Sequence, residues 1–312
     1  MTQDAIIIRE VGSREGVQIT KQPISLNQKI RLLNILYEAQ LDLIEATAIV
    51  RTDLVPNHAD WEEILTYCAS RADPKKFTAL YLNKKGFELS LRFPQLSIEP
   101  WLHTAVNEDF LIMNVNRSFS SELQYFEAMQ CAFQQTGFDY VNIMLSTCFG
   151  SIHEGLNTVS KIMQRLEQLF SSIKLPVKEL CLADTFGVCN PKLLKSVLEE
   201  LNRCKLAETI SLHLHNTNGL GLANALVGLE NGVRTFDSSI AGVGGCPFIP
   251  QASGNIPTEE VVLLARSSGF RVKADPQKLA FAVIEAKNIF GYETHSHLAL
   301  LTFDKLVDVL SA

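Results

Sequence analysis

Short β-branched runs alternate with segments of helical periodicity along this chain, and this alternation constrains the fold more than any other feature. Between the runs lie amphipathic stretches such as residues 191–204, where apolar residues recur every three or four positions after Pro191. The alternation predicts repeated β/α units around a parallel sheet. The predicted strands cover residues 5–11, 41–47, 77–82, 96–102, 138–145, 177–184, 208–215 and 234–239.

Eight such units favour an α/β fold of the (β/α)8 TIM-barrel type, and an open doubly wound sheet is the rival arrangement. The C-terminal stretch predicts further helices, which cover one side of the barrel or form a partner contact. We therefore predict a single domain over residues 1–312. Its barrel covers about 5–268, and a C-terminal helical extension covers about 269–312.

Composition narrows the class of protein. The 312 residues are 46% apolar, which is enough for a large buried core, and the net charge is −6 without a basic block. Nucleic-acid and membrane-surface partners are therefore not expected. The chain has neither a secretory pattern at its N-terminus nor a long apolar run. Its seven scattered cysteines lack CxxC pairing, which is typical of reduced thiols, so we predict a cytoplasmic protein.

Polar residues gather where the predicted strands end. In a TIM barrel the active site is assembled at the C-terminal ends of several strands, so these side chains are expected to converge. They are Arg14, Glu15 and Gln18 after the first strand, Glu45, Ser146, Asp184, His213, His215, and Cys246 and Asn255 in a glycine-rich loop.

His213 and His215 are two residues apart on a predicted strand, so their side chains point to the same side. Taken alone, this pattern is more often a pair of hydrogen-bonded core residues. Together with Glu15 as an oxygen donor, and Asn255 as a further candidate donor, the two imidazoles look like the ligand set of a divalent cation. Mixed nitrogen and oxygen ligation suits Mg²⁺, Mn²⁺ or a related ion.

The sequence resembles the 3-hydroxy-3-methylglutaryl-CoA (HMG-CoA) lyases, within the wider group of metal-dependent barrel lyases, aldolases and Claisen condensing enzymes. The motifs that carry the resemblance lie between residues 10 and 260 in the family order and the last is the most specific, whereas residues 89–145 and those after 265 match loosely. The motifs that carry it are EVGSREGVQ (10–18), IEATAIV (44–50), NKKGFE (83–88), LADTFGV (182–188), HLHNTNGLGLANAL (213–226) and DSSIAGVGGCPFIPQASGNIPTEE (237–260).

The resemblance implies that His213, His215, Asn255 and Glu15 bind the family's divalent cation, Mg²⁺ or Mn²⁺. Here this chain departs from its relatives, which usually have aspartate at position 15, so its ligand carboxylate is one methylene longer. Glutamate remains a good ligand for either ion. Two further departures are Asn216, where many relatives have aspartate, and residues 19–20, where Asn-Glu is usual.

The resemblance also implies the reaction, a retro-Claisen cleavage of a branched 3-hydroxyacyl-CoA to acetyl-CoA and, from HMG-CoA itself, acetoacetate. The cation holds the C3 alkoxide and the distal carboxylate, and Arg14 stabilises the thioester enolate. A metal-bound water, Glu15 or His213 is the base. Cys246 in its glycine loop helps to protonate the enolate.

Four further residues receive roles from the same resemblance. Asp184 is expected to orient His213 or a bound water rather than to cap a helix. Glu45 is expected to hold the guanidinium of Arg14. Gln18 and Lys21 are expected to contact the substrate, and the other cysteines to be buried thiols.

Three alternatives stay open from the sequence. The first is a metal-dependent aldolase or condensing enzyme for small 2-oxo acids, and the second is a lyase for a longer or differently branched 3-hydroxyacyl-CoA. The third is a non-catalytic relative with the lyase fold. A homodimer formed through the C-terminal helices is expected from similar proteins.

Overall fold

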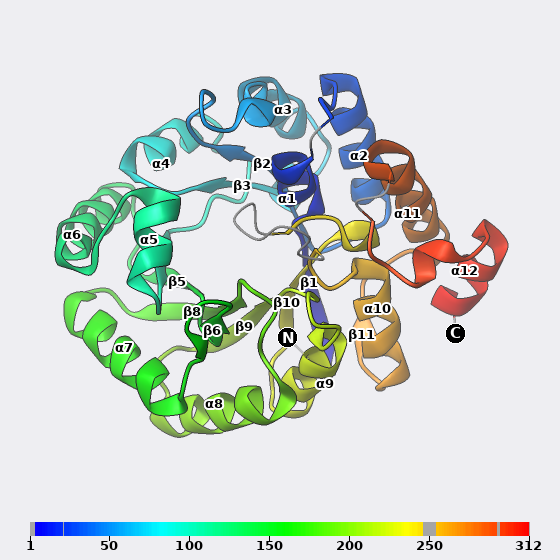
Figure 1. Cartoon of the computed structure of the whole chain (residues 1–312). Coiled ribbons are helices and arrows are strands. Elements are labelled where there is room, and N and C mark those ends of the chain that lie inside the picture. The colour runs from blue at the N-terminus through cyan, green and yellow to red at the C-terminus, as the bar shows by residue number, and fades with distance from the viewer. Residues whose placement is uncertain (1–3, 21, 246–253, 292–293, 312) are drawn as a thin grey trace.

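The computed structural model describes residues 4–20, 22–245, 254–291 and 294–311. Its central sheet contains eight parallel strands that curl around a common axis (Figure 1). A short β11 (Arg271–Val272) pairs with the start of the first strand, and β6 (Gly150–Ser151) and β7 (Gly155–Leu156) form a small separate hairpin. The eight strands are β1 (Ala5–Glu10), β2 (Leu43–Ile49), β3 (Phe77–Tyr81), β4 (Trp101–Ala105), β5 (Val141–Ser146), β8 (Val177–Asp184), β9 (Thr209–Leu214) and β10 (Thr235–Ser238).

The order of the strands decides between the two predicted architectures. Neighbours follow the order of the chain, and β1 pairs with β2 on one side and with β10, the last of the eight, on the other. A doubly wound sheet would instead reverse its order at an inner strand. The prediction of a TIM-like barrel is therefore confirmed.

The barrel has a seam between β3 and β4, which are the two ends of the paired path. The Tyr81 hydroxyl spans it, donating to the Glu99 carbonyl at 2.5 Å and accepting from the Trp101 amide at 2.9 Å. The Arg117 guanidinium also spans it by donating to the carbonyls of Leu82 and His103. At the seam, these side-chain hydrogen bonds take the place of the backbone hydrogen bonds that join the other neighbouring strands.

The fourth strand begins later than its sequence predicts. We expected residues 96–102, but β4 covers Trp101–Ala105. The Ser97 amide instead donates to the Phe77 carbonyl, and Pro100, which has no amide hydrogen, immediately precedes the strand. The apolar character of the segment before Pro100 therefore belongs to a connection.

Helices surround the sheet and cover its outer face (Figure 1). Several begin at side-chain caps, for example the capping box of Ser25 and Gln28 and the Asn190 cap before Pro191. The helices are α1 (Gly12–Ile19), α2 (Leu26–Glu38), α3 (Trp61–Ala69), α4 (Lys84–Ser90), α5 (Glu108–Val115), α6 (Phe119–Gln135), α7 (Val159–Ser172), α8 (Pro191–Cys204), α9 (Gly221–Glu230), α10 (Thr258–Ser267), α11 (Pro276–Phe290) and α12 (Phe303–Ser311).

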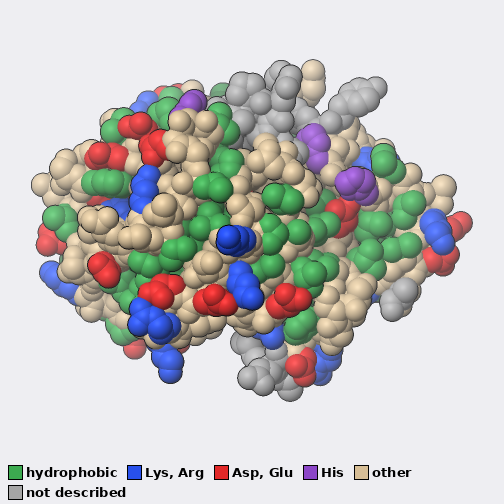
Figure 2. Space-filling model, turned by 60° about the horizontal axis from the view of Figure 1, so that its bottom comes forward, with side chains coloured by type: hydrophobic (Ala, Val, Ile, Leu, Met, Phe, Trp, Pro, Cys, Tyr) green, Lys and Arg blue, Asp and Glu red, His purple; other side chains and the backbone are tan. Residues whose placement is uncertain are grey.

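The predicted C-terminal helices are present as α11 and α12, which lie on one side of the barrel against α2 and α10 (Figure 1). The face shown in Figure 2 carries interspersed acidic, basic and apolar side chains. Within the described ranges, no helix combines the length and apolar character that a membrane crossing requires.

Side chains of β1 alternate between two environments. Ile6, Ile8 and Glu10 are buried, whereas Ile7 and Arg9 line a cavity inside the barrel. A charged residue on the inner side is unusual, because branched aliphatic side chains normally fill the interior of such barrels. The sequence of β1 therefore already marks the inside of this barrel as polar.

Candidate metal centre and active site

Glu15 reaches the centre of the site from the first turn of α1, which starts directly after β1. Its carboxylate is buried, with one oxygen 3.0 Å from Nη2 of Arg14. Gly244 lies against it with φ +107°. A Cβ there would come within 2.8 Å of Asn255 Nδ2 and 3.1 Å of Glu15 Cβ, so only glycine permits this close approach.

His213 and His215 are buried and face the same point, which confirms the prediction from their spacing. Their Nε2 atoms are 3.3 Å apart, and His213 Nε2 is 3.4 Å from a carboxylate oxygen of Glu15. Among the residues that the structure describes, these three form the one group of His, Cys, Asp or Glu side chains arranged to hold a metal ion.

Asn255 is held beside this group by backbone pairing. It forms an isolated antiparallel bridge with His215, and the Ile256 amide donates to the Leu214 carbonyl at 3.0 Å. The Asn255 Nδ2 donates to Glu15 at 2.5 Å. Its Oδ1 is buried and has no hydrogen-bond partner among the described residues, so this oxygen is available as a ligand.

The donor set fits a divalent cation. Ligand distances of about 2.1 Å in octahedral geometry separate neighbouring donor atoms by about 3 Å, close to the 3.3 Å between the two Nε2 atoms and the 3.4 Å between His213 Nε2 and Glu15. The third spacing, between His215 Nε2 and Glu15, is 4.0 Å. Sharing a cation would stabilise two imidazole nitrogens that lie so close together. The unpartnered oxygen of Asn255 points to the same conclusion, because a buried polar atom without a partner is costly.

Burial and nearby charges give the same groups the protonation states that bind metals. Burial alone would raise the pKa of Glu15, but Arg14 and the two histidines lower it to about 2. Burial lowers the pKa of His215 to about 4, which keeps its imidazole neutral near pH 7. An ionised carboxylate and a neutral imidazole are the forms that bind metals.

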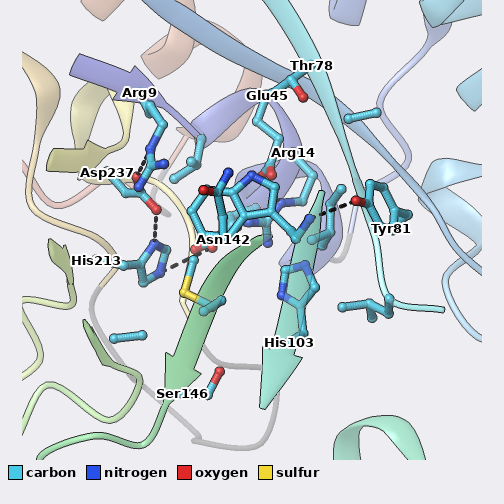
Figure 3. Close-up of a pocket in the computed structure, with 18 of the residues that line it drawn as sticks. Arg9, Arg14, Glu45, Thr78, Tyr81, His103, Asn142, Ser146, His213 and Asp237 are labelled. Carbon is cyan, nitrogen blue, oxygen red and sulfur yellow. Dashed lines mark hydrogen bonds and ion pairs between the residues drawn. The ribbon is translucent and has the colours of Figure 1, made fainter. Parts of the chain in front are cut away.

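Asp237 fixes the orientation of His213, a role that we predicted for Asp184. The Asp237 carboxylate lies 3.0 Å from His213 Nδ1, and this contact leaves Nε2 to face Glu15 and His215. Arg9 donates to the other oxygen of Asp237 at 2.6 Å (Figure 3). The alternation of side chains on β10 places Asp237 on the inner face, and this signal was present in the sequence.

Asp184 has different partners. Its two carboxylate oxygens accept hydrogen bonds from the backbone amides of Val188 and Cys189, each at 3.0 Å. Burial raises its pKa to about 7. Asp184 therefore shapes the loop after β8. The contact with His213 Nδ1 is made by Asp237 and not by Asp184, and the alternative role of Asp184, orienting a bound water, stays a prediction.

Replacing Asp237 by asparagine is expected to weaken divalent-cation binding about 10- to 100-fold, the usual effect of losing a carboxylate behind a histidine ligand. Titration calorimetry with Mn²⁺ measures this. Glu179→Gln is the matched control, because Glu179 also pairs with Arg9, at 2.7 Å, but has no contact with His213 among those observed. An equal loss in both variants would show that the Arg9 network, not the His213 contact, is responsible.

Arg14 is held as expected from the sequence. Its Nε donates to the Glu45 carboxylate at 2.5 Å, and both side chains line the cavity (Figure 3). Burial would lower the pKa of Arg14, but Glu45 and Glu15 raise it, so the guanidinium remains charged. The pair presents a fixed cation beside the metal-ligand cluster.

The remaining predicted residues divide into two groups. Gln18 and Ser146 line the same cavity. Lys21 and Cys246 lie outside the described residues.

The chain matches the family model described as HMGL-like over residues 5–283. It is 34% identical over 272 residues to the mitochondrial hydroxymethylglutaryl-CoA lyase of Macaca fascicularis, covering 87% of this chain and 82% of that one. It is 31% identical over 300 residues to the hydroxymethylglutaryl-CoA lyase of Pseudomonas mevalonii, covering 95% and 96%.

A solved structure agrees with these sequence matches. The fold resembles that of an HMG-CoA lyase from Acinetobacter baumannii in complex with coenzyme A and 3-methylmalate. The TM-score is 0.83 at 28% identity, and the alignment covers 96% of this chain and 95% of that chain.

Proposed function

The chain belongs to the HMGL-like family and is an HMG-CoA lyase-like carbon–carbon lyase, and from this premise we propose that it cleaves HMG-CoA or a related 3-hydroxyacyl-CoA. The observation that carries the proposal is the buried cluster of Glu15, His213 and His215 beside the cavity. The carboxylate and the two imidazoles, together with the unpartnered oxygen of Asn255, would hold Mg²⁺ or Mn²⁺.

When bound, the cation makes the C3 hydroxyl of the substrate more acidic and anchors it. The C2–C3 bond then breaks, the hydroxyl loses its proton, and C2 gains one. Arg14 is the group that stabilises negative charge on the thioester oxygen, because Glu45 holds its guanidinium in place. The pKa of Glu15 is lowered to about 2, which makes its carboxylate a weak base. Reprotonation of C2 by Cys246 rests on the sequence resemblance.

The substrate-binding roles of Gln18 and Lys21 belong to the same proposal. Gln18 lines the cavity, which supports its contact with the acyl group. A coenzyme A thioester is supported by the relative from Acinetobacter baumannii, whose structure contains coenzyme A.

We also propose a cytoplasmic homodimer. The six described cysteines are free, as is usual in a reducing compartment. Phe281 on α11 and Leu300 near α12 expose 47% and 80% of their surface, which suits a contact through the C-terminal helices. Analytical ultracentrifugation of the protein and of Phe281→Glu tests the dimer.

The proposed reaction is tested by acetyl-CoA release from HMG-CoA. Chelation is expected to abolish release, and Mg²⁺ or Mn²⁺ to restore it, because the cation would supply the positive charge that makes the C3 hydroxyl acidic. Release that survives complete chelation would contradict the metal-dependent mechanism. Absence of release with either metal would contradict HMG-CoA as the substrate.

A further inference from the structure

The cavity at the metal-ligand cluster continues along the inside of the barrel. Its volume is about 780 Å³. At one end it is lined by His213 and Ser146, near the C-terminal ends of their strands. It also reaches Trp101, Thr209 and Thr235, which are the first residues of β4, β9 and β10. In barrels of this type side chains normally fill this space, so the presence of a cavity inside this barrel requires an explanation.

The two arginines beside the metal-ligand cluster are already paired with carboxylates. Arg9 contacts Asp237 at 2.6 Å and Glu179 at 2.7 Å, and Arg14 contacts Glu45 at 2.5 Å. Arg14 also contacts Glu15 at 3.0 Å, so these two arginines face four carboxylates. Over the whole lining of the cavity seven carboxylates outnumber five cationic side chains, so an additional anionic group would meet a net negative wall.

Two uncharged polar side chains, Asn142 and His103, line the same space. Asn142 on β5 is 3% exposed, and its Oδ1 has no hydrogen-bond partner among the described residues. His103 on the adjacent β4 lines the cavity beside Tyr81, and no hydrogen bond to its ring nitrogens is observed within the described ranges (Figure 3). Burial, helped by the charge of Arg117, lowers the pKa of His103 to about 3, so the ring offers one donor and one acceptor.

Apolar surface completes the wall. Trp101, Met144 and Leu80 line the cavity together with His103 and Asn142. The interior therefore combines apolar walls with two neutral hydrogen-bonding groups. This combination is typical of a pocket for an uncharged organic group with a polar end.

We propose that this interior binds the substituent at C3 of the acyl-CoA substrate, and that this substituent is larger than methyl, uncharged and hydrogen-bonding. The inference rests on the proposed lyase function and names its substrate class, the 3-hydroxy-3-(hydroxyalkyl)glutaryl-CoA thioesters. Cleavage yields acetyl-CoA and a 3-oxo acid that keeps the substituent. The C3 hydroxyl loses a proton and C2 gains one, so no redox partner is needed.

The test uses three thioesters that carry methyl, propyl or 3-hydroxypropyl at C3, assayed with Mg²⁺ on the full chain. The wild type is expected to show at least about tenfold higher kcat/KM for the 3-hydroxypropyl than for the methyl substrate. Leu80→Phe fills the interior and is expected to lower the ratio of the 3-hydroxypropyl to the methyl kcat/KM about tenfold. Leu226→Phe, on the exposed side of α9, is the matched control and is expected to change neither value.

Asn142→Leu separates size from polarity. The variant is expected to lower the ratio of the 3-hydroxypropyl to the propyl kcat/KM about tenfold, because leucine cannot hydrogen-bond the terminal hydroxyl. Equal wild-type values for methyl and 3-hydroxypropyl, or an unchanged ratio in Leu80→Phe, would overturn the proposal.

Failure of the lyase function gives a different result. If the wild type cleaves none of the three thioesters, the proposed function fails, and calorimetric binding of the same thioesters with Mg²⁺ decides the role of the interior. Binding of the 3-hydroxypropyl compound that is about tenfold tighter than that of the methyl compound, and that is lost in Leu80→Phe, supports it. Equal binding rejects it.

Discussion

Arg14→Met is expected to lower kcat for acyl-CoA cleavage about 1000-fold while leaving the affinity for Mn²⁺ nearly unchanged. Arg14 is the cation assigned to the developing enolate, and loss of one group that stabilises an oxyanion costs about 100- to 1000-fold. Its neighbour Glu15 keeps its contacts with Asn255 and His213. Steady-state kinetics and Mn²⁺ titration calorimetry, run on the same preparation, measure the two effects separately.

Two control variants sharpen this result. Arg14→Lys keeps a charge but loses the fork that contacts Glu45 and Glu15 together, so an intermediate kcat is expected. Arg203→Met removes an exposed arginine that pairs with Glu200 on α8, and no change is expected. A loss of Mn²⁺ affinity in Arg14→Met that matched its loss of activity would assign Arg14 to the metal site instead.

Glu15→Gln is expected to weaken Mn²⁺ binding at least about 100-fold and to abolish metal-dependent cleavage. The substitution removes the one carboxylate of the cluster. Loss of a residue that only hydrogen-bonds to a ligand lowers metal affinity about 10- to 100-fold, and loss of a ligand itself is a larger change. Mn²⁺ titration followed by electron paramagnetic resonance reports binding without relying on turnover.

Glu15→Asp is the matched control. It keeps the charge and restores the residue that similar lyases usually carry, so Mn²⁺ binding is expected to persist. The shorter side chain draws the carboxylate away from Asn255, whose Nδ2 lies 2.5 Å from it. If Glu15→Gln bound Mn²⁺ as tightly as the wild type, the cluster of Glu15, His213 and His215 would not be the metal site.

The parts of the site that follow from strand periodicity could be predicted from the sequence. The spacing of His213 and His215 determines that their rings share a face, and the end of β1 places Arg14 and Glu15 at the same edge of the barrel. The strand count and the pairing of Arg14 with Glu45 are likewise observed.

Other features depend on contacts that no local pattern specifies. Strand alternation distinguishes Asp237, on the inner face of β10, from Asp184, but only the packed structure shows that Asp237 contacts His213. The predicted start of β4 is wrong because the residues before Pro100 have the composition of a strand but form a connection across the seam. The bridging role of the Tyr81 hydroxyl has no sequence signature, since a buried tyrosine hydroxyl usually has a hydrogen-bond partner but the sequence does not identify it.

The pairing of β1 with β10 closes the ring of strands and brings together residues from the two ends of the barrel sequence. Glu15 meets His213 and Asn255 only after that closure, and the contact between Asn255 and Glu15 joins residues 240 positions apart. A nascent chain shorter than 255 residues therefore lacks a complete ligand set, however well its first strands have paired. A cation held by this ligand set would stabilise only the closed barrel and would therefore favour closure by mass action.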